Sequence, residues 1–423
     1  MIGIIICKSI MNSYKLIQLK KETSNTFCLA KFHEATIWLY NSRMSSCHHT
    51  PTVILGDTIE TFYNPEEKRQ QQDEMLKGIK PSACNYCWNL EKQNLKSDRE
   101  LKSLSFKSHL NPTDYLNRNY NFKPKALELA FQNTCNLACS YCSPVYSTEW
   151  INDIKKHGVY TNIATDAKNH YYRGIDPSMP VNLDLFWTWF TDVVDDLESL
   201  RITGGEPLLH NETFQTFEMI VEKNPNIECV VATNLCQKEL IITRFIGLVN
   251  KLGNVRLNIS NESAGEVAEF IRDGMDYNQW LHNVERLAKE TKATLSISTT
   301  ITALSLISLD KLFLDIIKLR KNLNNKPSIA INIATYPEFQ SIQSLSYDER
   351  VFYYNKYNDF YNVHKDDLLD YEAKVFSRLT TLLDPKLLHE KHLDYKKDFI
   401  SFFKQYIIRR NKTDYVLNLL GKQ

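Results

Sequence analysis

Short runs of alternating apolar and polar residues occur at regular intervals through the middle of the chain. They occupy residues 127–131, 199–203, 227–232, 255–260, 294–301 and 328–334. A period of two is typical of β-strands, and the longer stretches between these runs have helical periodicity. The repetition of strand and helix predicts an α/β fold with a parallel sheet.

The rest of the chain has different patterns. After about residue 340 it is predicted to be helical, with a 3.6-residue periodicity over 348–354 and 399–409. Because Asp and Glu are interleaved there with Lys and Tyr, we expect a solvated helical cap rather than a nucleic-acid surface. The predicted domains are 1–119, 120–340 with an insertion at 146–196, and 341–423. The aromatic segment 186–190 of that insertion is expected to be core.

Composition excludes several classes of protein. The 423 residues include 51 basic and 50 acidic side chains and are 43% hydrophobic, as in an ordinary globular protein rather than a disordered one. A net charge of +1 gives no long-range attraction to nucleic acid or to an anionic membrane. No apolar run reaches the ~18 residues that span a bilayer, and no export signal is apparent, so we expect a cytoplasmic protein. We expect residues 1–10, before Met11, to be a dispensable extension.

Ten cysteines carry the strongest chemical signal. Cys135, Cys139 and Cys142 form a C-x3-C-x2-C on a loop that follows a predicted strand. Without export, disulfides are improbable, and clustered cysteines then indicate metal or redox ligands. Three thiolates can bind three irons of a four-iron cluster and leave the fourth iron open to a small molecule. A three-cysteine zinc site with a distant fourth ligand is the alternative.

From this loop onwards the sequence resembles the radical S-adenosylmethionine (SAM) superfamily, over most of residues 120–340. The resemblance rests on the cysteine triplet, on Tyr141 and on the Gly-Gly-Glu-Pro motif directly after a predicted strand. It implies a partial (β/α)6 barrel with a SAM-binding [4Fe–4S] cluster. It also implies that Tyr141 packs on the adenine, and that backbone groups of Gly204, Gly205, Glu206 and Pro207 hold the methionine amine. We expect the two glycines to admit a close approach to that ligand.

The segment after the fourth barrel strand resembles SPASM- and twitch-type members of the superfamily. This resemblance implies that Ser260 and Arg272 contact the ribose and the carboxylate of SAM, because a guanidinium suits a carboxylate. The alternative for Arg272 is a solvated arginine on a helix. The sequence departs from the usual pattern in having Asn261 and Glu262 after the serine, and Leu235 after Asn234.

A second set of cysteines lies near the amino terminus. The set consists of Cys28, Cys47, Cys84 and Cys87, and residues 40–43 are predicted to turn a hairpin between the first two. The resemblance to twitch-type members implies an auxiliary [4Fe–4S] cluster here, with a structural zinc as the main alternative. His48 or His49 could replace one ligand. Cys7, Cys229 and Cys236 lack partners at ligand spacing, and Cys229 is expected to pack in the core.

Together these features predict an oxidoreductase-type radical SAM enzyme. It would receive an electron from a donor such as flavodoxin or ferredoxin and cleave SAM to a 5′-deoxyadenosyl radical that abstracts hydrogen from its substrate. A peptide or protein is the first predicted substrate class. A small molecule, nucleotide-sugar or nucleobase is the alternative, and a non-catalytic iron–sulfur or zinc protein is the third hypothesis.

Overall fold

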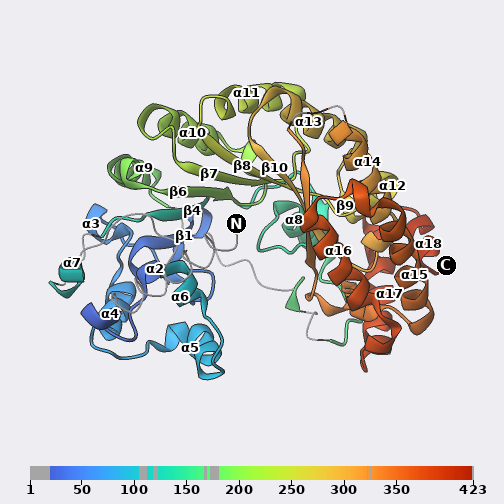
Figure 1. Cartoon of the computed structure of the whole chain (residues 1–423), viewed down its shortest axis with the longest axis horizontal. Helices are drawn as coiled ribbons and strands as arrows, with labels where there is room; N and C mark the ends of the chain where they lie inside the picture. The colour runs from blue at the N-terminus through green and yellow to red at the C-terminus, as the bar shows by residue number, and fades with distance from the viewer. Residues whose placement is uncertain are drawn as a thin grey trace. The chain divides into compact units, whose positions relative to one another are not determined.

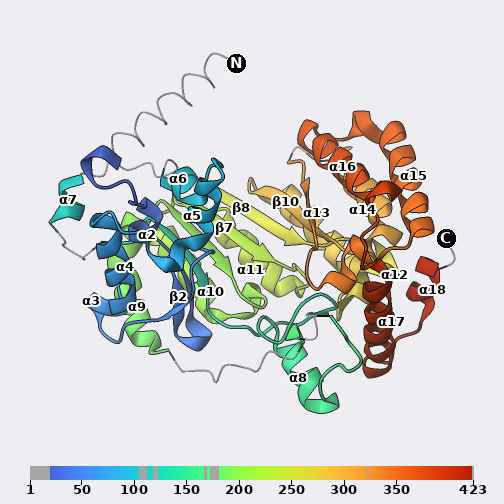
Figure 2. The same cartoon turned by 90° about the horizontal axis from the view of Figure 1, so that it is seen from below.

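The computed structural model has an α/β fold in which most strand pairs are parallel. It describes residues 20–103, 112–117, 122–165, 169–171, 181–321, 323 and 325–421. The chain forms two compact units that we call the first unit (1–131, 177–202 and 218–229) and the second unit (132–176, 203–217 and 230–423). Figures 1 and 2 label the elements of both units.

The strands of the first unit follow the order β6-β4-β1-β2-β3. Their bounds are Glu34–Trp38 (β1), Arg43–Ser45 (β2), Val53–Ile54 (β3), Ala126–Ala130 (β4) and Ser199–Thr203 (β6). Strand β1 pairs parallel with β4 and antiparallel with β2. The turn from β1 to β2 includes Ser42 in the left-handed conformation, so the predicted hairpin between Cys28 and Cys47 is confirmed.

Short helices surround these strands, and their apolar faces form the core of this unit. The helices are α2 (Leu29–His33), α3 (Ile59–Phe62), α4 (Glu66–Leu76), α5 (Asn85–Lys92), α6 (Asp98–Ser103), α7 (Pro112–Leu116) and α9 (Leu183–Val193). Phe62 of α3 packs against Trp189 of α9, with ring centroids 4.9 Å apart. Phe186, Trp189 and Phe190 are buried, which confirms the predicted core role of that aromatic segment.

Strands of the second unit follow the order β11-β10-β8-β7. They comprise Glu228–Thr233 (β7), Asn254–Ser260 (β8), Thr294–Ile301 (β10) and Ser328–Ile333 (β11), and β10 pairs parallel with both neighbours. Alternate residues of β10 are buried, as its alternating sequence predicts. All six strands predicted from the apolar pattern are present, with ends shifted by at most one residue.

Helices alternate with these strands and complete the β/α repetition. They are α10 (Asn211–Lys223), α11 (Glu239–Val249), α12 (Gly265–Ile271), α13 (Tyr277–Glu290) and α14 (Leu309–Lys321). Helices α11 and α13 pack against each other beside strands β7, β8 and β10 (Figure 1). Asp276 caps α13, since its side chain accepts from the backbone of Gln279 at 2.9 Å. Whether the strands close into the partial barrel stays a prediction.

The carboxyl-terminal part is helical, as its periodicity predicts. Helices α15 (Tyr347–His364), α16 (Asp370–Leu383), α17 (His392–Arg409) and α18 (Tyr415–Gly421) follow the last strand, and α15 packs against α16. A buried ion pair between Arg320 and Glu372 joins α14 to α16. Helix α8 (Thr148–His157) contributes Trp150, which stacks near Phe402 of α17. Among the described residues, no helix has both the length and the apolar character needed to cross a membrane.

Candidate active site

The cysteine triplet lies on a loop of the second unit that is fixed by its backbone. Cys139 belongs to the short strand β5 (Ala138–Cys139), which pairs antiparallel with β9 (Arg272–Asp273). The carbonyl of Cys139 accepts from the indole of Trp150 at 2.9 Å, and the carbonyl of Ser140 accepts from Tyr171 at 2.6 Å. Buried donors thus hold the loop in place independently of any ligand.

Hydrogen-bond donors are directed at two of the three sulfurs. The Sγ of Cys135 accepts from the backbone N–H of Leu137 at 3.4 Å and from Nδ2 of Asn234 at 3.7 Å. A guanidinium nitrogen of Arg272 lies 3.7 Å from the Sγ of Cys139. Hydrogen bonds to thiolate sulfur are a regular feature of iron–sulfur sites, where they help to set the reduction potential. The donor set therefore fits a cluster bound through three thiolates.

Burial dominates the titration of these thiols. It raises the pKa of Cys142 to about 12, and it also raises the pKa of Cys135 and of Cys139. The nearby Arg272 opposes the shift in all three. Thiols in such surroundings are inert until a metal takes the place of the proton. Within the described part of the chain, no three Cys, His, Asp or Glu side chains converge closely enough to share a single metal ion.

The Gly-Gly-Glu-Pro turn packs against the start of the cysteine loop. The N–H of Gly205 donates to the carbonyl of Gln132 at 3.0 Å, and the N–H of Glu206 donates to that of Thr134 at 2.8 Å. A Cβ on Gly205 would lie 2.3 Å from the oxygen of Thr134 and 2.6 Å from the carbonyl carbon of Asn133. The sequence suggested that glycine admits a ligand here. The structure shows that a contact within the chain also requires it.

The carboxylate of Glu206 joins this turn to the end of β7. It is buried and accepts from the hydroxyl of Thr233 at 2.6 Å, the N–H of Asn234 at 2.6 Å and the N–H of Leu208 at 3.1 Å. Burial raises the pKa of Glu206 to about 7, although the three hydrogen bonds oppose the shift. Asn234 in turn reaches Cys135, so the motif and the cysteine loop form one bonded network.

Arg272 is not a solvated helix residue. It ends helix α12, forms part of β9, and only 4% of its surface is exposed. Its Nε and one terminal nitrogen donate to the same carboxylate oxygen of Glu262, at 3.0 and 2.8 Å. That terminal nitrogen also lies 2.7 Å from the hydroxyl of Tyr141. The solvated alternative for Arg272 is therefore wrong.

Glu262 is the site residue that sequence reasoning missed. It is fully buried, and its second carboxylate oxygen has no hydrogen-bond partner among the described residues. The sequence offered it only as a departure from the usual pattern after Ser260. An acidic residue at a strand end with an arginine ten residues later was the available signal. Ser260 ends β8 as expected, and Pro207 is buried at the start of a 3-10 turn (Pro207–Leu209).

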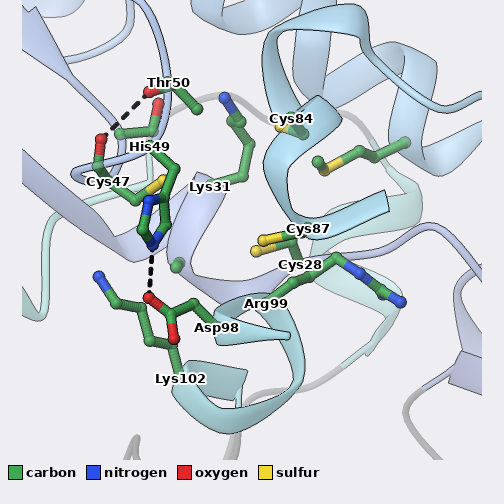
Figure 3. A pocket seen from close by; sticks show the side chains of 13 residues that line it. Cys28, Lys31, Cys47, His49, Thr50, Cys84, Cys87, Asp98, Arg99 and Lys102 are labelled. Carbon is green, nitrogen blue, oxygen red and sulfur yellow. Dashed lines mark hydrogen bonds and ion pairs between the residues drawn. The ribbon is translucent and has the colours of Figure 1, made fainter. Parts of the chain in front are cut away.

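The second cysteine set comes together in the first unit. Cys28, Cys47, Cys84 and Cys87 line one pocket (Figure 3). Cys28 precedes α2, Cys47 follows β2, Cys84 immediately precedes α5, and Cys87 lies on that helix. The cavity is small, about 20 Å³, which is close to the ~10–15 Å³ that a single water molecule needs. The hairpin and the C-x2-C helix thus meet, as their spacing predicted.

Cationic side chains also line this pocket. They are Lys31, Arg99 and Lys102. Burial raises the pKa of Cys84, and Lys31 opposes that shift through its charge and a hydrogen bond to the thiol. Burial likewise raises the pKa of Cys28 to about 12. Lys31 favours the thiolate of Cys28 and of Cys84, whereas Arg99 and Lys102 are paired with Glu91 and Glu34.

The two neighbouring histidines have carboxylate partners. Nε2 of His49 lies 2.6 Å from Asp98 at the edge of the pocket, and its ring stacks on Tyr86. Nε2 of His48 lies 2.9 Å from Glu128. His49 is thus the histidine that the structure brings to the cysteines, whereas His48 is not among the residues that line their pocket.

The remaining cysteines divide into three cases. Cys229 is fully buried within β7, which confirms its predicted core role. Cys236 follows the end of β7, and its carbonyl accepts from Nδ2 of Asn136 at 2.7 Å, which brings it close to the triplet. Cys7 and residues 1–10 lie outside the described residues, as do parts of the predicted insertion.

Comparison with known proteins agrees with this chemistry. The family model described as the Radical SAM superfamily matches residues 129–313. The GTP 3′,8-cyclase of Sulfurimonas denitrificans is 23% identical over 150 residues, which span 36% of this chain and 38% of that protein.

Solved structures also match at low identity. The crystal structure of Streptococcus suis SuiB is similar at 13% identity, with a TM-score of 0.36, over 79% of this chain and 69% of that one. SuiB bound to its precursor peptide SuiA matches at 12% identity, with a TM-score of 0.35, over 79% and 70% of the two chains. The family model covers both the cysteine triplet and the Gly-Gly-Glu-Pro turn, so it is the part of this chain that carries both motifs that is similar to the radical SAM superfamily.

Proposed function

We propose that this protein is a radical SAM enzyme whose Cys135, Cys139 and Cys142 hold a [4Fe–4S] cluster. The observation that carries the proposal is the loop itself, in which N–H donors face two cysteine sulfurs and the Gly-Gly-Glu-Pro turn is bonded to the residues just before the first cysteine. Bound there, such a cluster would supply the electron that splits SAM into methionine and a 5′-deoxyadenosyl radical.

The chain's own residues would bind and orient the sulfonium cofactor. The backbone of Gly204, Gly205 and Pro207 is proposed to hold the methionine amine, with Glu206 fixing that turn to the end of β7. Tyr141 is proposed to pack on the adenine, and Ser260 at the end of β8 to contact the ribose. Buried aromatic side chains such as Trp150 and Tyr171 hold the loop from behind and keep water away from it.

Anaerobic reconstitution with iron and sulfide tests this proposal. Reduced wild-type protein should slowly form 5′-deoxyadenosine from SAM, even without a substrate. Replacing Cys135, Cys139 and Cys142 together by Ala should abolish this formation, because three ligands are lost. Cys229→Ala is the matched control, since Cys229 is a buried core cysteine, and it should leave the reaction intact. Equal product from the triple variant would exclude the assignment.

Two substrate classes follow from different observations. The resemblance of the segment after β8 to SPASM- and twitch-type members supports a peptide or protein. The relative named GTP 3′,8-cyclase supports a nucleotide. Adding GTP, or separately a mixture of peptides, to the reduced enzyme distinguishes them, because the true substrate should accelerate 5′-deoxyadenosine formation.

We also propose that Cys28, Cys47, Cys84 and Cys87 hold an auxiliary [4Fe–4S] cluster. Their shared pocket supports this, and so does Lys31, because four thiolates carry negative charge that a nearby cation compensates. A structural zinc ion is the alternative at the same four sulfurs, although these side chains would have to converge further to share a single ion. Iron and zinc analysis decides between the two.

A further inference from the structure

All three nitrogens of the Arg272 guanidinium have partners within the protein. Two of its nitrogens donate to Glu262, one of these also meets Tyr141, and the remaining terminal nitrogen lies 3.7 Å from the Sγ of Cys139. The hydroxyl of Tyr141 completes the triangle by donating to Glu262 at 3.2 Å. Arg272 and Glu262 are both buried, so water does not compete for these bonds.

The backbone fixes this guanidinium beside the cysteine loop. Cys139 is the direct partner of Arg272 in the pairing of β5 with β9, and the N–H of Ser140 donates to the carbonyl of Ile271 at 2.7 Å. Gly274 follows with a φ of +98°, and a Cβ there would lie 2.8 Å from the carbonyl oxygen of Asn136. The direction in which Arg272 donates is therefore determined by the fold.

This commitment argues against a role in gripping the carboxylate of SAM. A bidentate grip uses two N–H groups on one side of the guanidinium, and Glu262 already occupies Nε together with one terminal nitrogen. Releasing them would leave a buried carboxylate without its cation, which is strongly unfavourable.

We propose that Arg272 is a positioning residue that donates to Cys139 and raises the reduction potential of the cluster bound by the triplet, with Glu262 and Tyr141 holding it there. This inference rests on the function proposed above. Reduction adds one electron to the cluster, from a donor of the flavodoxin or ferredoxin class, and no bond or proton is exchanged. A positive N–H donor at the sulfur stabilises the added negative charge, whereas the carboxylate of Glu262 opposes it.

Redox titration of the full-length reconstituted protein tests the inference without SAM and without turnover. The midpoint potential is followed by electron paramagnetic resonance. The signal of the triplet cluster is first identified, in a separate sample, as the one that changes when SAM is added. Arg272→Gln should move the midpoint to a more negative potential, and Arg272→Lys should lie between that variant and wild type. Glu262→Gln should move it the opposite way, because a negative charge is removed.

A matched control is available in the same unit. Arg320 and Glu372 form an ion pair of equal burial between α14 and α16, and Arg320→Gln should leave the midpoint unchanged. Opposite shifts in the two site variants are a signature that mere loosening of the structure would not produce.

Three outcomes would overturn the inference. An unchanged midpoint in Arg272→Gln with weaker SAM binding would assign Arg272 to the SAM carboxylate. Loss of iron from both Arg272→Gln and Arg272→Lys would mean that the residue only holds the loop. Midpoint shifts of the same sign in Arg272→Gln and Glu262→Gln would lead to the same conclusion. If wild-type protein binds no SAM-responsive cluster, the proposed function itself fails. This failure is distinguished from a failure of the Arg272 inference because it is seen in wild-type protein, before any variant is measured.

Discussion

Gly205 shows how a single missing side chain joins two motifs. Its backbone N–H donates to Gln132, and the space that a Cβ would need is filled by the backbone of Asn133 and Thr134. The sequence identified this glycine through its motif. It could not identify the neighbours, because they lie some seventy residues earlier in the chain. The same limit applies to Glu262, whose importance depends on the direction of Arg272 and not on any local pattern.

Replacing Gly205 by Ala should destabilise the second unit and weaken cluster retention. A Cβ 2.3 Å from a backbone oxygen forces the two segments apart, and overpacking of this kind costs about 1–3 kcal/mol. Gly247→Ala is the control, because Gly247 lies within α11 with no atom within 4 Å of the new Cβ. That substitution should stabilise the protein by about 0.5–1 kcal/mol. Urea unfolding and iron analysis measure both effects, and equal stability of the two variants would refute the packing argument.

At the scale of elements, patterning predicted the strands better than the short helices. The alternation in 294–301 matches β10 to the residue, because a strand with one buried side must alternate. Helix α2 spans only five residues, all of them buried, so tertiary packing rather than sequence periodicity maintains it. It also ends in a buried histidine. His33 donates from Nδ1 to the carbonyl of Lys123 at 2.9 Å and accepts at Nε2 from Tyr115 at 2.7 Å.

This junction of α2 and β1 should make the first unit sensitive to acid. Burial first, and then the positive charges of Lys68 and Lys125, lower the pKa of His33 from 6.5 to about 4. The unfolded chain therefore takes up a proton between pH 6.5 and 4 while the folded chain does not, and stability falls as the pH falls through this range. The loss should reach about 3 kcal/mol, since each pKa unit corresponds to about 1.4 kcal/mol.

The variant His33→Asn isolates this contribution, because Asn does not titrate. Urea unfolding at pH 7, 5.5 and 4, followed by tryptophan fluorescence, should show a steeper decline for wild type than for the variant. Parallel declines would mean that His33 is not the source of the acid sensitivity.

At the scale of the whole molecule, the two cysteine sets belong to different compact units. The triplet lies in the second unit, and Cys28, Cys47, Cys84 and Cys87 lie in the first. The sequence pattern predicts consecutive domains, and that division stays a prediction. The sequence pattern could not reveal that residues 181–202 and 218–229 pack with the first unit, because the reason is a set of contacts such as Phe62 with Trp189.

This separation predicts that one metal centre can be removed without the other. Wild-type protein reconstituted without oxygen should hold about eight irons per chain, the sum of two four-iron clusters. Replacing Cys84 and Cys87 by Ala should remove about half of the iron and leave the cleavage of SAM detectable. One zinc and about four irons per wild-type chain would instead identify the auxiliary site as structural, and complete loss of SAM cleavage would contradict the independence of the two centres.

The interleaving of the two units also bears on how the protein is made. A ribosome releases the chain from its amino terminus, and units built from one continuous segment can fold in that order. Here the first unit lacks part of its core until residue 229 has emerged, and by then the thiols of both cysteine sets have left the ribosome. The proposed auxiliary site is therefore not expected to fold before the cysteine triplet has been synthesised. If both proposed clusters form, iron–sulfur assembly would meet a chain that presents all seven proposed ligand thiols at once.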